Sequence, residues 1–258
     1  MKDYLVFRLY GPMASWGQPA VGGDRATDNA PTRSAILGLL GAALGIKRED
    51  AATLESLHTQ VKVATKQVTP TSLLRDYHTS QVPSRNRKYL YRTRRNELVD
   101  ELKDKLNTVL STRDYRCDGV WTVAVSLTQE TAEGLAPLTL EQLKQALLKP
   151  VYVLSLGRKS CPLAAPLLPV ILENVRLKEA LDTEFPSIMD VDKPYLDNIW
   201  LRPGKLATYR WEGEADEFTG ESVLTTHPWD DPVSRDRWQF RQRTQHQVTL
   251  QQVITKEA

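Results

Sequence analysis

The order of strand-like and helix-like segments limits the fold of this chain more than any other feature. Bulky side chains alternate along Asp3–Tyr10, and Val120–Leu127 (VWTVAVSL) is the clearest strand pattern. Two further strands are predicted, over Val61–Val68 and Val151–Leu156. Helices are predicted for a segment that begins at Thr32 or Ser34 and runs to Ile46, with Gly45 as a stop signal, and for Asp50–His58, Asn96–Leu110 and Thr139–Leu148.

Together these segments follow the order strand, helix, strand, insertion, strand, helix, strand. This order is typical of split β-α-β folds, so we expect an α+β chain with a ferredoxin-like or RRM-like domain. The length of 258 residues fits one large domain or two small ones. We expect the core in residues 1–74 and 117–169 and an insertion in 75–116. Residues 170–258 lack strong periodicity and are rich in Pro, Asp and Trp, which predicts a small, irregular or β-rich C-terminal appendage.

Charge is concentrated at the start of the insertion. Between Arg75 and Arg95 there are seven basic residues and one acidic residue, whereas the whole chain has a net charge of +2. Four rings lie among these cations: Tyr77, His78, Tyr89 and Tyr91. Cations pair with phosphates and aromatic faces stack with unpaired bases, so single-stranded nucleic acid is the first partner to consider. A solvated basic surface fits the composition equally well.

Several other classes of protein fit the sequence poorly. Asp3 and Arg8 interrupt the first apolar run, and the uncharged stretch Ser34–Ile46 is too short to cross a bilayer, so we expect neither a signal peptide nor a membrane span. Two cysteines, Cys117 and Cys161, make neither a disulfide framework nor a zinc site, which favours a reduced, cytoplasmic compartment. We expect no cofactor and no metal.

The loop after the first strand contains Gly11 and Gly17 and is the first candidate to compare with a phosphate-binding loop, which needs Gly-x-x-x-x-Gly followed by Lys and Ser/Thr. However, Gly17 is followed by Gln18 instead of the Lys-Ser/Thr pair that holds phosphate and Mg²⁺, which argues against nucleotide binding. Trp16 in this loop either packs in the core or stacks on a base.

Two short segments have the chemistry to bind phosphate. Thr32-Arg33-Ser34 begins a helix, where free N–H groups attract anions; the alternative is simple capping, with Arg33 in a salt bridge. Gly157-Arg158-Lys159-Ser160 follows an expected strand and either grips a sugar-phosphate chain or forms a basic surface turn.

Catalysis has one candidate centre. RNA can be cut without metal when side chains move protons at the 2′-OH and the leaving oxygen, and His78 beside Tyr77 has suitable chemistry. The sequence contains no His-Glu-x-x-His or Gly-x-Ser-x-Gly motif. A single histidine in a basic loop is more often a binding residue, so we favour binding over cleavage.

Four sequence blocks in the same order resemble one family. They are Arg8–Pro19, Pro31–Ser34 together with Leu37–Ile46, Leu74–Thr79, and Leu156–Pro162, with Tyr115–Asp118 as a weaker match. These blocks resemble the CasD subunit family of the type I-E CRISPR Cascade complex, in the RAMP superfamily. The similarity extends from Met1 to about Pro169, and the acidic tail beyond it matches poorly.

The resemblance implies a RAMP-type ferredoxin-like domain with an inserted β-hairpin thumb over residues 75–116. It implies a non-catalytic subunit that holds and caps the 5′ handle of the CRISPR RNA. Its neighbours would be the CasC backbone subunit and the large CasA subunit, and it would meet target DNA only through the assembled complex. Relatives in another subtype cut the precursor RNA, so a metal-independent endoribonuclease is the alternative, with His78 and Tyr77 as its candidate catalytic residues. A third hypothesis is a protein-interaction subunit with a basic surface.

Carried onto this chain, the resemblance places the RNA against the loops at strand ends and the base of the thumb. The residues that it implies in RNA binding are Met13, Trp16, Gln18, Arg25, Thr32, Arg33, Ser34, Arg75, Tyr77, His78, Arg113, Gly157, Arg158, Lys159 and Ser160.

Overall fold

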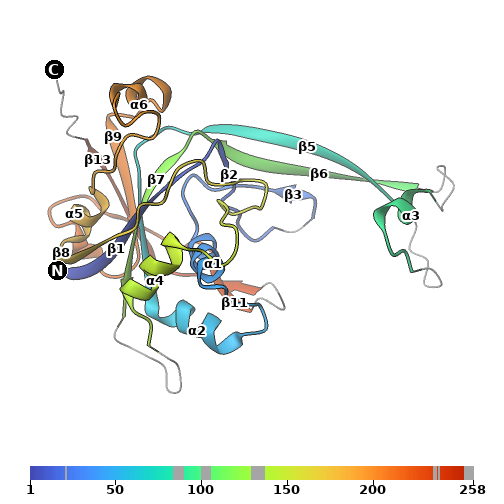
Figure 1. Cartoon of the computed structure of the whole chain (residues 1–258), viewed down its shortest axis with the longest axis horizontal. Helices are drawn as coiled ribbons and strands as arrows, with labels where there is room; N and C mark the ends of the chain where they lie inside the picture. Colours follow the sequence, from blue (N-terminus) through green and yellow to red (C-terminus); the bar gives the residue numbers. More distant parts are fainter. Residues whose placement is uncertain are drawn as a thin grey trace.

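The computed structural model describes residues 1–20, 22–83, 90–99, 106–128, 137–234, 237 and 239–252. Its main feature is a seven-stranded sheet in the order β10-β13-β9-β4-β7-β1-β8 (Figure 1). The strands are β1 (Lys2–Tyr10), β4 (Val61–Gln67), β7 (Val120–Leu127), β8 (Val170–Val175), β9 (Leu206–Trp211), β10 (Leu224–Thr226) and β13 (Gln245–Gln251). The helices are α1 (Arg33–Leu44), α2 (Ala51–Gln60), α3 (Arg94–Val99), α4 (Leu140–Leu148), α5 (Leu177–Leu181) and α6 (Tyr195–Trp200), with a 3₁₀ turn at Ala215–Glu217. The expected α+β class is confirmed.

Strand β1 is buried on both of its faces. Leu5, Phe7 and Leu9 point into the cluster beneath α1, α2 and α4, whereas Tyr4 and Val6 point into a second cluster beneath α5. Successive side chains of a strand alternate between faces, so a strand with bulky residues at every position can fill two cores at once. The sheet therefore separates two hydrophobic layers.

Several predicted elements are confirmed close to their expected ends. Strands β1, β4 and β7 match the three predicted strands before residue 130. Helix α1 stops at Gly45, whose φ of 77° lies in the left-handed region that glycine tolerates. Helix α4 begins at a capping box in which Thr139 and Gln142 exchange hydrogen bonds.

The predicted strand at Val151–Leu156 is wrong. The backbone N–H groups of Val151 and Tyr152 donate instead to the carbonyl oxygens of Ala43 and Ala42, at the end of α1. The last carbonyl groups of a helix lack the donors that a continuing helix would supply, and here they accept the N–H groups that a strand ladder would need. The sheet position next to β1 belongs instead to β8, which begins at Val170.

The segment after residue 170 is β-rich, as expected, but it is built into the main sheet. Strand β9 pairs with β4 over Ala64–Gln67, and β13 pairs with β9 along its whole length. The predicted domain boundary between residues 169 and 170 stays a prediction. One sheet nevertheless continues across this position.

The insertion forms a long antiparallel hairpin that projects from the body of the molecule (Figure 1). Strands β5 (Ser72–Pro83) and β6 (Leu106–Cys117) pair from Ser72↔Cys117 to Pro83↔Leu106. The predicted helix Asn96–Leu110 is therefore wrong over Leu106–Leu110, which pair with β5. The cations Arg85, Arg87 and Lys88 of the basic stretch lie outside the described residues. Among the helices described, none is long and apolar enough to cross a membrane.

Candidate nucleic-acid interface

Segments from several parts of the sequence meet around one cavity of about 710 Å³. Six of the residues predicted to bind RNA line it: Gln18, Arg25, Thr32, Ser34, Gly157 and Arg158. They come from the loop after β2 (Met13–Ala14), from β3 (Asp24–Arg25), from the start of α1 and from the loop after Leu156. We call this cavity the central pocket.

Gly157 fixes the contact between two of these segments. The N–H of Ser15 donates to the carbonyl oxygen of Leu156 at 2.9 Å, which holds the two loops side by side. Gly157 has a φ of 86°, and a Cβ atom there would lie 1.9 Å from the oxygen of Ser15. Only glycine combines this backbone conformation with this close approach.

Arg158 extends from the same loop to the insertion and to β3. Its guanidinium group lies 5.0 Å from the ring centroid of Tyr115 and donates to the carbonyl oxygen of Arg25 at 3.1 Å. A second, longer hydrogen bond of 3.5 Å reaches the carbonyl oxygen of Asp114. Because these acceptors are neutral carbonyls, Arg158 keeps its positive charge uncompensated by them at the edge of the pocket.

Gln18 and Arg25 form the outer wall. Gln18 Nε2 donates to Asp28 Oδ2 at 3.0 Å, and Arg25 donates to the carbonyl oxygen of Ala20 at 3.0 Å. Both side chains are exposed. Among the described residues that line the pocket there are two arginines and no acidic residue. This composition suits an anion that carries polar groups.

Trp16 does not face the pocket. Its side chain is 1% exposed and packs edge-on against Trp121, with ring centroids 5.1 Å apart. The assignment of Trp16 as an RNA-binding residue is therefore corrected, and core packing, the first of the two alternatives, is right. The apolar ring gains more by leaving water than it would by stacking at an exposed edge.

Arg33 is also corrected. Its side chain is 6% exposed and is held by Asp231 at 2.9 Å and by Glu212 at 2.6 Å. The carbonyl oxygens of His58 and Val61 accept two further hydrogen bonds from its guanidinium group. Burial lowers the pKa of Arg33, but the two carboxylates outweigh this effect and raise it. All of these partners belong to the chain itself, so Arg33 is a structural cation and not a phosphate ligand.

A carboxylate already occupies part of the predicted anion site at the start of α1. The backbone N–H of Arg33 donates to Asp230 Oδ2 at 2.7 Å, and Arg243 binds both oxygens of Asp230. Thr32 is buried, and Ser34 is half-buried with its hydroxyl 3.3 Å from that of Thr32. Ser34 is thus the residue at this helix start that combines a hydroxyl, partial exposure and a place in the pocket wall.

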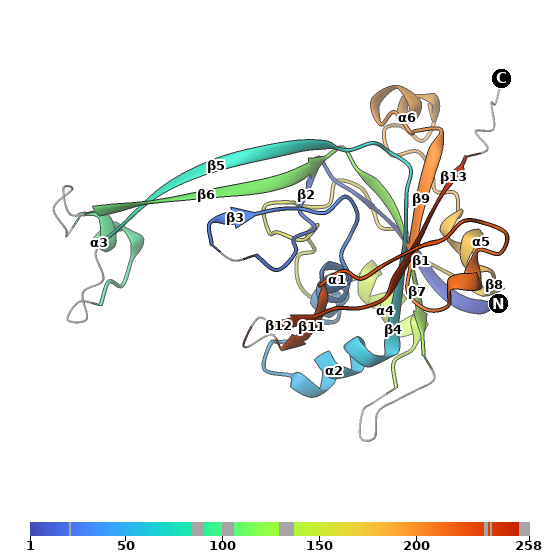
Figure 2. The same ribbon diagram turned by 180° about the vertical axis from the view of Figure 1, so that it is seen from behind.

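The C-terminal segment supplies a wall that the sequence did not predict. Pro232 of β11 (Asp231–Ser234) and Phe240 of β12 (Gln239–Arg241) line the central pocket. The two strands form a small sheet beside the start of α1 (Figure 2). No local sequence pattern indicates these residues, because long-range contacts such as the ion pairs of Asp230 and Asp231 place them beside the pocket.

The base of the hairpin carries three of the predicted residues, on two faces. Arg75 Nε lies 2.8 Å from Asp114 Oδ1, and hydrogen bonds from Arg75 hold the pKa of Asp114 below its usual range. Tyr77 is 61% exposed, and His78 contacts the carboxylate of Asp76. Adjacent strand residues point to opposite faces, so the hairpin does not bring Tyr77 and His78 together.

Four further predicted residues are not among those that line the pocket. Arg113 lies opposite Asp76 on β5 and is paired in register with Arg25 on β3. Met13 is half-buried in β2, where it pairs with Cys117. Lys159 and Ser160 are exposed.

Comparisons with known proteins decide the family. A family model described as "CRISPR-associated protein (Cas_Cas5)" matches residues 4–246. The chain belongs to this family. A curated relative from Escherichia coli (strain K12), the "CRISPR system Cascade subunit CasD", is 40% identical over 176 residues, which cover 65% of this chain and 70% of the relative. The resemblance to CasD is confirmed.

Two solved structures share the fold of this Cas5-family chain. A chain of a "CRISPR RNA-guided surveillance complex" is 24% identical with a TM-score of 0.60, over 96% of this chain and 89% of the other. A second, described as "Crystal structure of Cas protein", is 22% identical with a TM-score of 0.58, over 96% and 95%. At these identities the likeness shows the fold alone.

Proposed function

We propose that this Cas5-family chain is a non-catalytic, RNA-binding subunit of a Cascade complex for antiviral defence. In this proposal it holds and caps the 5′ handle of the CRISPR RNA. The observation that carries the proposal is the convergence of Gln18, Arg25, Ser34 and Arg158 on one pocket whose described lining holds no acidic residue. The relative named as a Cascade subunit supports the assignment to a complex.

The chemistry of the pocket suits a splayed single strand. Arg25 and Arg158 supply cations for phosphates, while the carboxamide of Gln18 and the hydroxyl of Ser34 offer both donors and acceptors to base edges. The ring of Phe240 adds an apolar face for a base. A duplex would not present its base edges to a concave pocket of this size, so a single-stranded end is the better fit.

The architecture supports finer assignments within this proposal. The subset β4-β7-β1-β8, with α1 and α4 in the connections, has the strand order of a ferredoxin-like domain. The hairpin β5–β6 corresponds to the thumb, and its length lets it extend beyond the pocket to the RNA backbone and the next subunit. The partners in this proposal are the CasC backbone subunit and the large CasA subunit, and target DNA is met only through the complex. The compartment in this proposal is the cytoplasm.

The test compares handle RNA with a scrambled RNA of the same length, over a range of salt concentrations. Arg25→Gln and Arg158→Gln should each weaken binding of both RNAs and lower the slope of log K against log salt by about 0.7 per lost phosphate contact. Gln18→Ala should lower the preference for the handle over the scrambled RNA. Arg202→Gln, an exposed cation outside the described pocket lining, is the matched control and should change neither quantity.

Two results would count against the proposal. Unchanged affinity and salt slope in both pocket variants would favour a pure protein-interaction subunit. Cleavage of repeat RNA at one defined phosphodiester by the purified chain without metal, lost in His78→Ala, would favour the endoribonuclease. No observation on the described hairpin favours that second function, since Tyr77 and His78 lie on opposite faces.

A further inference from the structure

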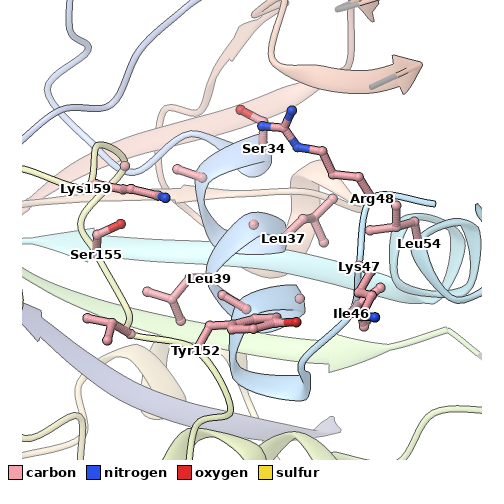
Figure 3. A pocket seen from close by; sticks show the side chains of 16 residues that line it. Ser34, Leu37, Leu39, Ile46, Lys47, Arg48, Leu54, Tyr152, Ser155 and Lys159 are labelled. Atoms are coloured by element: carbon pink, nitrogen blue, oxygen red, sulfur yellow. The ribbon is translucent and has the colours of Figure 1, made fainter. Parts of the chain in front are cut away.

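A second cavity, of about 830 Å³, runs along the outer side of α1. Figure 3 shows α1 as its floor, with Tyr152 and Lys159 on one side and Lys47, Arg48 and Leu54 on the other. We call it the α1 groove. It meets the central pocket only at one end, where Ser34, Ala35 and Gly157 line both cavities.

The floor of the groove carries small side chains in a row. Ala35, Gly38 and Ala42 are spaced so that they lie on one face of α1. A Cβ atom built at Gly38 would meet nothing within 4 Å, so the space above the helix axis is open. A row of small residues lets another helix pack close to the backbone of α1.

One wall of the groove belongs to an exposed apolar segment. Tyr152 and Val153 line the groove and are 44% and 93% exposed, and the preceding residue, Val151, is 64% exposed. Their sequence predicts a buried strand, yet hydrogen bonds to the end of α1 hold Val151 and Tyr152 outside the sheet. Three consecutive bulky residues with this exposure, next to an apolar groove, mark an interaction surface.

The charge of the groove has one sign. Its described lining contains three cations, Lys47, Arg48 and Lys159, and no acidic residue. Like charges that line an apolar groove attract a partner of the opposite charge and disfavour one of the same charge. An anionic, amphipathic occupant is therefore the best fit.

RNA is the weaker of the two anionic candidates here. Away from the shared end, the lining includes five bulky aliphatic residues: Leu37, Leu39, Ile46, Leu54 and Val153. A base pressed against these side chains would lose the hydration of its polar edges without gaining hydrogen bonds. Bulky apolar side chains of a protein helix have no such edges.

We propose that the α1 groove is the docking site for an amphipathic helix of another protein, with aliphatic or aromatic residues on its buried face and acidic residues on its flanks. Its buried face would lie on Ala35, Gly38 and Ala42 and against Val153. Its carboxylates would pair with Lys47 and Arg48. This site is separate from the central pocket, and it rests on the proposed function only in that its partner is a protein of the same complex.

The test places a photoreactive benzoylphenylalanine at Val153 in the full chain within its purified complex. After irradiation, the cross-linked product is digested and sequenced. The expected product is a peptide from a different protein, with apolar residues at helical spacing and Asp or Glu beside them. A cross-link to RNA, to a basic peptide or to a second copy of this chain would overturn the proposal, as would the absence of any cross-link in the intact complex.

Direct binding then measures the contribution of the groove. The peptide identified by the cross-link is made synthetically, and its affinity for the full chain is measured. Val153→Glu and Lys47→Glu should each weaken it about tenfold or more. Val191→Glu, 70% exposed but outside the groove, is the control and should leave it unchanged. Equal affinities in all four proteins would refute the site, and an unchanged affinity for handle RNA in Val153→Glu would confirm that the two cavities act separately.

Discussion

Arg33 and Asp231 lie 198 residues apart and form a buried ion pair, with 2.9 Å between Nε and Oδ1. Both side chains are less than a tenth exposed. Asp231 begins β11, so this pair fixes the small C-terminal sheet beside the start of α1 and brings Pro232 and Phe240 into the wall of the central pocket. The buried ion pair thus positions part of the wall of the central pocket, although the charge of Arg33 is itself not exposed there.

Loss of this cation should be costly. Arg33→Met leaves the carboxylates of Asp231 and Glu212 buried with fewer partners, so we expect a loss of about 3–5 kcal/mol in the free energy of unfolding. Arg241 also bonds Asp231, but its side chain is 61% exposed, and Arg241→Met should cost about 1 kcal/mol or less. Urea denaturation measures both variants, and equal losses would contradict the structural role of Arg33.

Acid should weaken the same contact. Burial raises the pKa of Asp231, but hydrogen bonds from His58 and Arg241 and the charge of Arg33 outweigh it and hold the pKa well below its ordinary value. A carboxyl with a lowered pKa stabilises the fold fully above its unfolded pKa of about 4, and this contribution is lost as the pH falls toward the folded pKa.

The variant Asp231→Asn tests this pH dependence. The difference in unfolding free energy between the native chain and the variant should shrink as the pH falls from about 5 through about 4. Thermal or urea unfolding at a series of pH values measures it. A difference that grows as the pH falls would show that the carboxylate does not stabilise the fold.

Gly157 should tolerate no side chain. Gly157→Ala places a Cβ atom against the oxygen of Ser15 and strains a positive φ, which should separate the two loops and weaken binding of handle RNA. Gly220 has a φ of 84° and open space around it, so Gly220→Ala carries only the conformational cost of about 1–2 kcal/mol. Gly157→Ala should cost about 1–3 kcal/mol more in unfolding experiments. Equal costs would show that the loops adjust freely.

The two tryptophans that pack edge-on should differ in their response to replacement by phenylalanine. Trp121 Nε1 donates to the carbonyl oxygen of Asn29 at 3.2 Å, whereas Trp16 Nε1 is buried without a partner. Trp121→Phe should therefore destabilise the chain by about 1 kcal/mol more than Trp16→Phe. The affinity of Trp16→Phe for handle RNA should match that of the native chain, and a tenfold loss at unchanged stability would restore Trp16 as a base-stacking residue.

The local sequence pattern was sufficient to predict those elements in which the side-chain periodicity and the backbone hydrogen bonds favour the same structure. Strands β1 and β7 have alternating bulky residues along their whole length, and α4 has both its cap and its apolar face in the sequence. Val151–Leu156 has the same apolar character but is not a strand, because the carbonyl oxygens at the end of α1 accept hydrogen bonds from the N–H groups of Val151 and Tyr152. Competition between a helix end and a sheet for the same N–H donors depends on tertiary contacts, so it cannot be recognised in a local window of sequence.

The amino-acid sequence was sufficient for the family, for the α+β class and for the pocket residues Gln18, Arg25, Ser34 and Arg158, but it did not indicate Pro232 and Phe240. Only the tertiary structure decided which cations face the pocket. Arg33 and Arg158 are the same residue type. The guanidinium group of Arg33 forms ion pairs with Asp231 and Glu212, whereas that of Arg158 donates to backbone carbonyl oxygens and lies beside the ring of Tyr115. A cation can bind an external anion only where the residues that long-range contacts place around it do not already neutralise its charge.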